Sequence, residues 1–110
     1  TLTYQRNYPA TINSETEANF AAEVAEQLVG EANVVRDLPP SMGAEDFSLY
    51  AKQVPGFFFM VGATSPGKDA DTAASTHSPE FFLDEEALKV GTRAMLQVAL
   101  DYQHGTTTAR

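Results

Sequence analysis

Two short polar segments contain the side chains best suited to chemistry, and His77 is the more informative residue. It stands in Thr76-His77-Ser78-Pro79, within a polar loop expected over residues 63–80. Neutral imidazole is a good ligand for Zn, Mn, Co or Ni, and long loops in compact domains are often functional. No second histidine follows at i+2 or i+4, and the chain has no His-Glu-x-x-His pattern. The spacing alone therefore leaves a metal ligand and an ordinary loop histidine as open interpretations.

The second polar segment is Ser41-Met42-Gly43-Ala44-Glu45-Asp46-Phe47, at the start of a helix expected from about residue 44 to 53. Its carboxylates suit the positive end of a helix dipole, which is a purely structural interpretation. In the functional interpretation, Gly43 and Ala44 offer backbone N–H groups to a substrate carboxylate. Glu45 would then face a metal ligand or accept a structural hydrogen bond.

The remaining side chains that could take part in chemistry give no evidence of a catalytic role. Ser75 and Ser78 flank His77, but no acid-base-nucleophile arrangement can be inferred from the spacing. His104 follows the last turn of a predicted helix, where a cation suits the negative helix end. We therefore assign no catalytic residue within this chain.

Composition excludes several classes of partner. The chain has 110 residues and a formal net charge of −8, with only seven scattered Lys and Arg, so we expect no nucleic acid and no anionic membrane as partner. No apolar stretch approaches the roughly 20 residues that cross a bilayer, and the first residues lack the apolar core of a secretory signal. The absence of cysteine excludes disulfides and thiolate metal sites and fits a reducing compartment. We therefore expect a cytoplasmic protein.

Hydrophobic patterning predicts alternating strands and helices, an order that is typical of the α/β class. A continuous apolar run suits a strand that is buried on both faces. Predicted strands cover residues 2–8, Val34–Val35 and Phe57–Val61. Predicted helices run from Asn13 or Ser14 to Gly30, over 44–53, and from Asp84 onward. The first begins at the capping-box pattern Ser14-Glu15-Thr16-Glu17 and has an apolar face of Phe20, Val24 and Leu28, with Ala21 and Ala25 beside them. The last has a buried stripe of Leu88, Met95, Val98 and Tyr102.

Four segments in this order resemble the carboxyl-terminal end of amidohydrolases of the aminoacylase/carboxypeptidase G metallopeptidase family. The branch is that of hippurate hydrolases, N-acyl-amino-acid amidohydrolases and auxin-conjugate hydrolases. The segments are Tyr8–Asn13, Met42–Phe47, Val54–Ala63, and Thr76–Pro79 followed by Asp84–Leu88. Each segment alone is a modest match, but the ordered set is specific and covers residues 2 to 103.

The resemblance implies an α/β fold, a partial three-layer sandwich that forms the closing portion of a mixed-sheet metallopeptidase catalytic domain. Residues 1–10 would be the last strand of a lid (dimerisation) domain and its hinge. Residues 11–104 would be the carboxyl-terminal part of the catalytic domain, and 105–110 a frayed tail. A homo-oligomer is expected, formed through residues 2–8 or the sheet edge.

The same resemblance implies a site and a reaction. His77 would be a metal ligand in an enzyme that binds two divalent ions (Zn, Mn, Co or Ni). Gly43, Ala44 and Glu45 would border the pocket for a small N-acyl amino acid resembling hippurate. Metal-activated water would hydrolyse the amide bond of that substrate.

This chain lacks the earlier sequence that carries the other ligands and the general base of such enzymes. One imidazole cannot hold a catalytic metal, because hydrolytic zinc sites use about three protein ligands and a water. We therefore expect a piece of a longer enzyme that is inactive when isolated. The alternative hypothesis is a free-standing acidic α/β module that binds a partner or a small anion without catalysis.

Overall fold

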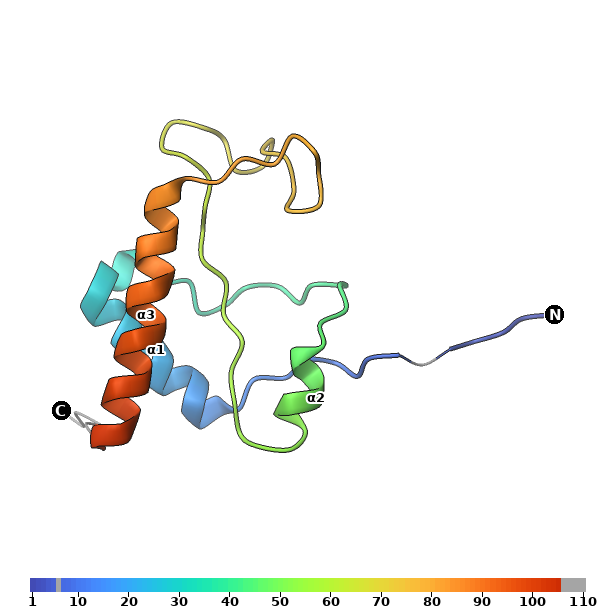
Figure 1. Cartoon of the computed structure of the whole chain (residues 1–110), viewed down its shortest axis with the longest axis horizontal. Coiled ribbons are helices and arrows are strands. Elements are labelled where there is room, and N and C mark those ends of the chain that lie inside the picture. The colour runs from blue at the N-terminus through green and yellow to red at the C-terminus, as the bar shows by residue number, and fades with distance from the viewer. Residues whose placement is uncertain (6, 106–110) are drawn as a thin grey trace. The chain divides into compact units, whose positions relative to one another are not determined.

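The computed structural model describes residues 1–5 and 7–105 (Figure 1). The chain divides into two units. The first unit, Thr1–Phe59, contains helix α1 (Glu15–Val29), the 3-10 helix η1 (Glu31–Asn33) and the short helix α2 (Phe47–Ala51). The second unit begins at Met60 and contains one long helix, α3 (Glu85–His104). No helix in the described part of the chain is both long enough and apolar enough to cross a membrane.

Helix α1 begins and ends where the sequence predicts. Ser14 is its N-cap residue, but its side chain accepts no hydrogen bond from a helix N–H; the Ser14 hydroxyl donates instead to the Glu17 carboxylate three residues later. Gly30 ends the helix with φ 86°, a backbone conformation that favours glycine. Ala21 and Val24 are buried on the predicted apolar face, at 8% and 3% exposure. The core of the first unit therefore lies along this face of α1.

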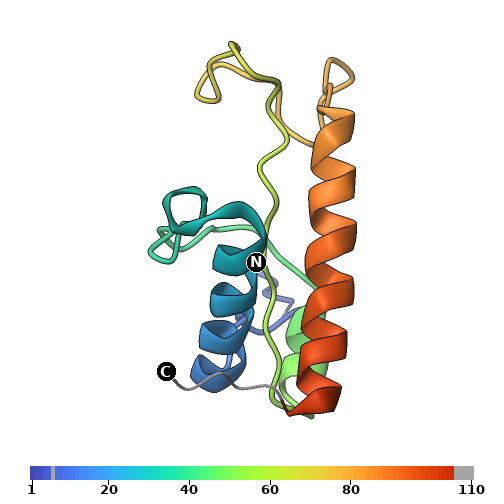
Figure 2. The same ribbon diagram turned by 90° about the vertical axis from the view of Figure 1, so that its left-hand side faces the viewer.

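Helix α3 also begins at its predicted residue. Asp84 is the N-cap, and its Oδ1 accepts a hydrogen bond of 3.0 Å from the Glu86 N–H. Gly105 ends the helix in the left-handed conformation. The loop from Ala63 to Asp84 projects beyond the N-terminal end of α3 (Figure 2). The helix cap therefore coincides with the end of the loop that carries His77.

The predicted α/β sandwich is wrong for this chain, because residues 1–5 and 7–105 form no β-strand. Strand propensity expresses how well a residue fits a pleated, half-buried sheet surface, so it requires neighbouring strands. Val34–Val35 and Phe57–Val61 have no such neighbour in the described residues, and the predicted strand at 2–8 is likewise absent from its described part. Instead of being buried on both faces, Phe58 and Met60 are 36% and 69% exposed.

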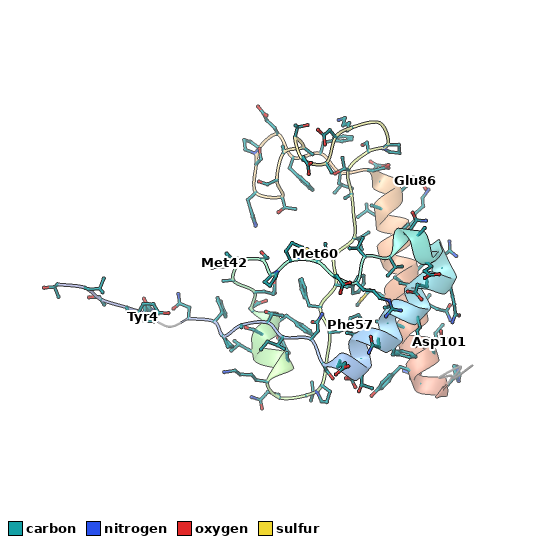
Figure 3. The ribbon with its side chains drawn as sticks, turned by 180° about the vertical axis from the view of Figure 1, so that it is seen from behind. Tyr4, Met42, Phe57, Met60, Glu86 and Asp101 are labelled. Carbon is teal, nitrogen blue, oxygen red and sulfur yellow. The ribbon has the colours of Figure 1, made fainter. Side chains whose placement is uncertain are left out.

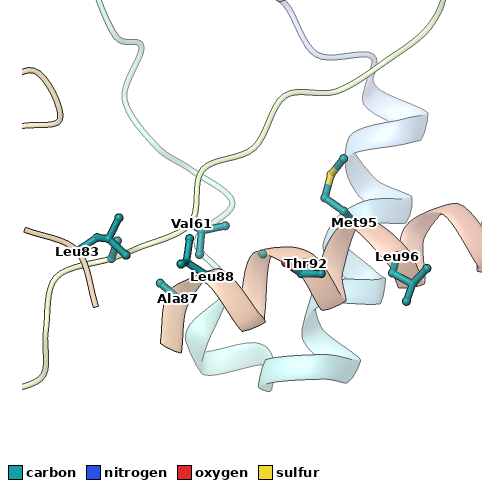
Figure 4. Close-up of a pocket in the computed structure, with 9 residues that line it drawn as sticks. Val61, Leu83, Ala87, Leu88, Thr92, Met95 and Leu96 are labelled. Carbon is teal, nitrogen blue, oxygen red and sulfur yellow. The ribbon is translucent and has the colours of Figure 1, made fainter. Parts of the chain in front are cut away.

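The buried stripe predicted for α3 is wrong at three of its four positions. Leu88, Met95 and Tyr102 are 59%, 61% and 67% exposed. The fourth member, Val98, is half-buried, and it shares the half-buried side of the helix with the small residues Ala87, Gly91 and Ala94. The larger apolar residues line an open groove of about 750 Å³ (Figure 4), formed by Val61, Ala63, Leu83, Ala87, Leu88, Gly91, Thr92, Met95 and Leu96.

Candidate functional site

His77 lies at the centre of a tight turn. The Ser78 N–H donates to the Ser75 carbonyl at 2.9 Å, so that Thr76 and His77 are the two central residues. A second turn follows directly, in which the Phe81 N–H donates to the Ser78 carbonyl at 3.0 Å. Consecutive turns fix the backbone on the C-terminal side of His77 and leave the residue itself exposed.

The loop that carries His77 is closed at its base. The Asp84 N–H donates to the Ala63 carbonyl at 2.8 Å, which joins the first and last residues of the loop. Closer to its tip, the Lys68 ammonium lies 5.2 Å from the centre of the Phe82 ring, within the range of a cation–π contact. His77 is therefore presented on a loop that is held at two levels.

The described residues do not by themselves fit a metal site. They contain no group of three His, Asp or Glu side chains that could hold an ion. Among them, no hydrogen bond, ion pair or ring contact engages the His77 imidazole. An exposed imidazole of this kind can supply one ligand to a site whose remaining ligands come from other polypeptide.

Gly43, Ala44 and Glu45 lie together in the first unit, but they do not form the helix start that was predicted. Helix α2 begins only at Phe47 and has five residues. Gly43 therefore lies outside the helix, and the helix dipole does not favour an anion there. The Gly43 N–H donates instead to the Ser41 hydroxyl at 3.2 Å. Next to this segment, the Met42 side chain is fully exposed (Figure 3).

Glu45 has the structural hydrogen bond that was one of its two predicted roles. Its Oε1 accepts from the Phe47 N–H at 3.1 Å, and its backbone carbonyl accepts from the Ser48 N–H at 3.3 Å. Both contacts satisfy N–H groups at the start of α2, which have no partner within the helix. Glu45 is half-buried, so its carboxylate both anchors α2 and remains partly open to solvent.

Two polar side chains of this region were not recognised as candidates from the sequence. Asn13, considered only as an alternative helix start, binds both backbone groups of Phe58. Ser48 is completely buried on α2, and its hydroxyl has no hydrogen-bond partner within the described residues. Neither has a signal in local patterning, because their environment is created by segments distant in sequence.

The comparisons with known proteins show the family. The profile of Peptidase family M20/M25/M40 matches residues 1–101, so the chain belongs to this family. The chain is 36% identical over 95 residues to IAA-amino acid hydrolase ILR1-like 4 of Arabidopsis thaliana, which is 86% of this chain and 21% of that protein. It is 36% identical over 92 residues to N-acetylcysteine deacetylase of Bacillus subtilis, covering 84% of this chain and 22% of the deacetylase.

A further relative is Thermostable carboxypeptidase 2 of Saccharolobus solfataricus, which is 28% identical over 97 residues, or 88% of this chain and 23% of the carboxypeptidase. The chain thus spans about a fifth of the length of the curated relatives that it matches. No solved structure matches the chain significantly. The resemblance stated from the sequence motifs is confirmed at the level of the family.

Proposed function

We propose that this chain is part of a metal-dependent amidohydrolase that cleaves the amide bond of small N-acyl amino acids. The match of the family profile to residues 1–101 carries the proposal. The relatives support it, because they include a hydrolase of IAA-amino acids and a deacetylase of N-acetylcysteine. All of these substrates are amides formed between an acyl group and an amino acid.

His77 is the metal ligand that this chain contributes. Its exposed position on a doubly anchored loop suits a residue that must reach an ion held by other polypeptide. The ion, which we propose to be one of two divalent metals, would supply an activated water to the reaction. Gly43, Ala44 and Glu45 border the substrate pocket, and the Gly43–Glu45 backbone and carboxylate contribute polar groups for orienting the substrate.

Because this chain offers one proposed ligand, the 110 residues alone do not hydrolyse the substrate. The described residues lack a cluster of three ligands, and hydrolytic sites use about three. Self-association and a cytoplasmic location remain predictions from the sequence. Exposed apolar residues at the amino-terminal end, with Leu2 at 94% and Tyr4 at 79%, support self-association.

The test compares two proteins on the same substrates. The isolated chain and the product of the complete open reading frame that encodes it are assayed for hydrolysis of N-acetyl and N-benzoyl amino acids with added Zn²⁺, Mn²⁺, Co²⁺ or Ni²⁺. We expect activity only in the longer protein. Turnover by the isolated chain would refute the incomplete site, and no turnover by the longer protein on any N-acyl amino acid would refute the proposed reaction.

A further inference from the structure

The Asn13 side chain takes the place of a neighbouring strand. Its Nδ2 donates to the Phe58 carbonyl at 2.9 Å, and its Oδ1 accepts from the Phe58 N–H at 2.8 Å. Two residues of adjacent antiparallel strands exchange this same pair of bonds. The next residue adds a third contact, since the Ser14 N–H donates to the Gly56 carbonyl at 2.9 Å. The start of α1 thereby fixes the backbone of residues 56–58.

The chemistry of this contact requires an amide at position 13. Phe58 presents one donor and one acceptor, and a carboxamide offers the complementary acceptor and donor. An ionised aspartate has acceptors only, so one of its oxygens would face the Phe58 carbonyl. Asparagine therefore satisfies both backbone groups of a segment that has no partner strand in the described residues.

The fixed segment in turn supports the start of α2. The rings of Phe58 and Phe47 lie 5.6 Å apart between centroids, at an angle of 46°. Gly56 also packs against Phe47, because a Cβ placed at Gly56 would lie 3.4 Å from the Phe47 Cζ atom. The Phe47 N–H is the donor that holds the Glu45 carboxylate at 3.1 Å. A continuous series of contacts thus connects Asn13 through Phe58 and Phe47 to Glu45.

We infer that Asn13 is a positioning residue for the segment Gly43–Glu45, acting through Phe58 and Phe47. This inference rests on the proposed function in that the segment is taken to border the substrate pocket. Asn13 itself touches no substrate. Its role is to keep Phe47 in the place where the Phe47 N–H can orient the Glu45 carboxylate.

The experiment measures amide hydrogen exchange by NMR on the 110-residue protein and its variants. Asn13→Ala removes both bonds to Phe58, whereas Asn13→Asp keeps an acceptor and removes the donor. Asn33→Ala is the matched control, because Asn33 Nδ2 donates to the Val29 carbonyl at 2.7 Å, away from the 43–58 region of the sequence. Glu45→Ala removes only the last contact of the series.

We expect Asn13→Ala to speed exchange of the Phe58 N–H and the Phe47 N–H, each by roughly three- to tenfold, the effect of losing one ordinary hydrogen bond. Asn13→Asp should speed exchange at both amides by a smaller factor. If Asn13→Ala fails to fold, the exchange rates of Asn13→Asp at Phe58 and Phe47 provide the test. Glu45→Ala should speed exchange at Phe47 and leave Phe58 unchanged. The inference would be overturned if Asn13→Ala speeds exchange of the Phe58 N–H and leaves that of the Phe47 N–H unchanged. It would also be overturned if Asn33→Ala speeds exchange of both amides as much as Asn13→Ala does.

A second measurement separates this inference from the proposed function. N-benzoylglycine is titrated into each variant while the Gly43 and Ala44 amide resonances are followed. We expect shifts in the unaltered protein and in Asn33→Ala, with affinity about three- to tenfold lower in Asn13→Ala. If the unaltered protein shows no shift at these amides, the substrate assignment fails, and the exchange data alone decide the positioning role. If the shifts occur with equal affinity in Asn13→Ala, the positioning role fails and the substrate assignment stands.

Discussion

Asp84 offers the sharpest test of how the His77 loop and α3 depend on each other. Its Oδ1 accepts a hydrogen bond of 3.0 Å from the Glu86 N–H, and its own N–H closes the loop on the Ala63 carbonyl. Replacing Asp84 by alanine removes the cap and leaves the backbone contact chemically intact. Loss of an N-cap side chain costs about 1 kcal/mol, within a range of roughly 0.5–2 kcal/mol. We therefore expect Asp84→Ala to lower the free energy of unfolding by about 1 kcal/mol.

Asp84→Asn separates the hydrogen bond from the charge. Asparagine caps helices as well as aspartate, so Asp84→Asn loses only the interaction of the charge with the helix dipole, at least about 0.3 kcal/mol, and it should cost less than Asp84→Ala. The assay is urea unfolding followed by circular dichroism at 222 nm, since α3 is the longest helix in the described chain. A loss in Asp84→Asn as large as that in Asp84→Ala, or no loss in either, would refute the capping argument.

Three further predictions use the same unfolding assay, each with a matched control. Val24→Ala should lower the free energy of unfolding by about 2 kcal/mol, because Val24 is 3% exposed. Its control, Val35→Ala, should lower it by about 0.5 kcal/mol, because Val35 is 68% exposed. Equal losses would show that Val24 is not in a core. Gly67→Ala should lower the free energy of unfolding by about 1 kcal/mol, because Gly67 has φ 82° and a Cβ is disfavoured there. Gly62→Ala should be nearly neutral, because Gly62 has equally open surroundings and no positive φ. Similar losses in the two variants would show that the positive φ of Gly67 is not the cause. Lys68→Gln should cost about 0.5 kcal/mol through its lost contact with Phe82, and Lys52→Gln should cost less; no difference between them would show that this contact does not hold the loop.

Local sequence signals predicted the helices well. The Ser14–Glu17 pattern and Gly30 defined both ends of α1, and Asp84 defined the start of α3. These signals work because capping is decided by residues within one turn of each other. The apolar face of α1 was also correct, since the 3.6-residue period selects one side of the helix for burial.

Signals that depend on distant partners failed. Phe57–Val61 has the composition of a buried strand, but strand formation needs neighbours that the described residues do not provide, and Phe58 binds the Asn13 side chain instead. Leu88 and Met95 have the period of a buried stripe, yet they remain exposed in this chain. Periodicity identifies a face that is apolar, and it cannot say whether residues of the same chain cover that face.

The candidate site was predictable in part. A polar loop that presents His77 was expected, and the structure places His77 in an exposed turn on such a loop. The expected helix start at Gly43 and Ala44 was wrong, because Glu45 accepts the Phe47 N–H and α2 begins there. The family was identified from four ordered motifs, and the profile match over residues 1–101 confirms it.

The metal content of the complete protein tests the central claim most directly. His77→Ala and His104→Ala are introduced separately into the product of the full open reading frame, and bound metal is measured by elemental analysis after dialysis against a range of free Zn²⁺. Changes to residues that only support a ligand already cost about 10- to 100-fold in metal affinity, so His77→Ala should lose at least that much. His104→Ala should bind metal as the unaltered protein does, because His104 lies at the end of α3. Full metal content at unchanged affinity in His77→Ala would contradict the assignment of this imidazole as a ligand.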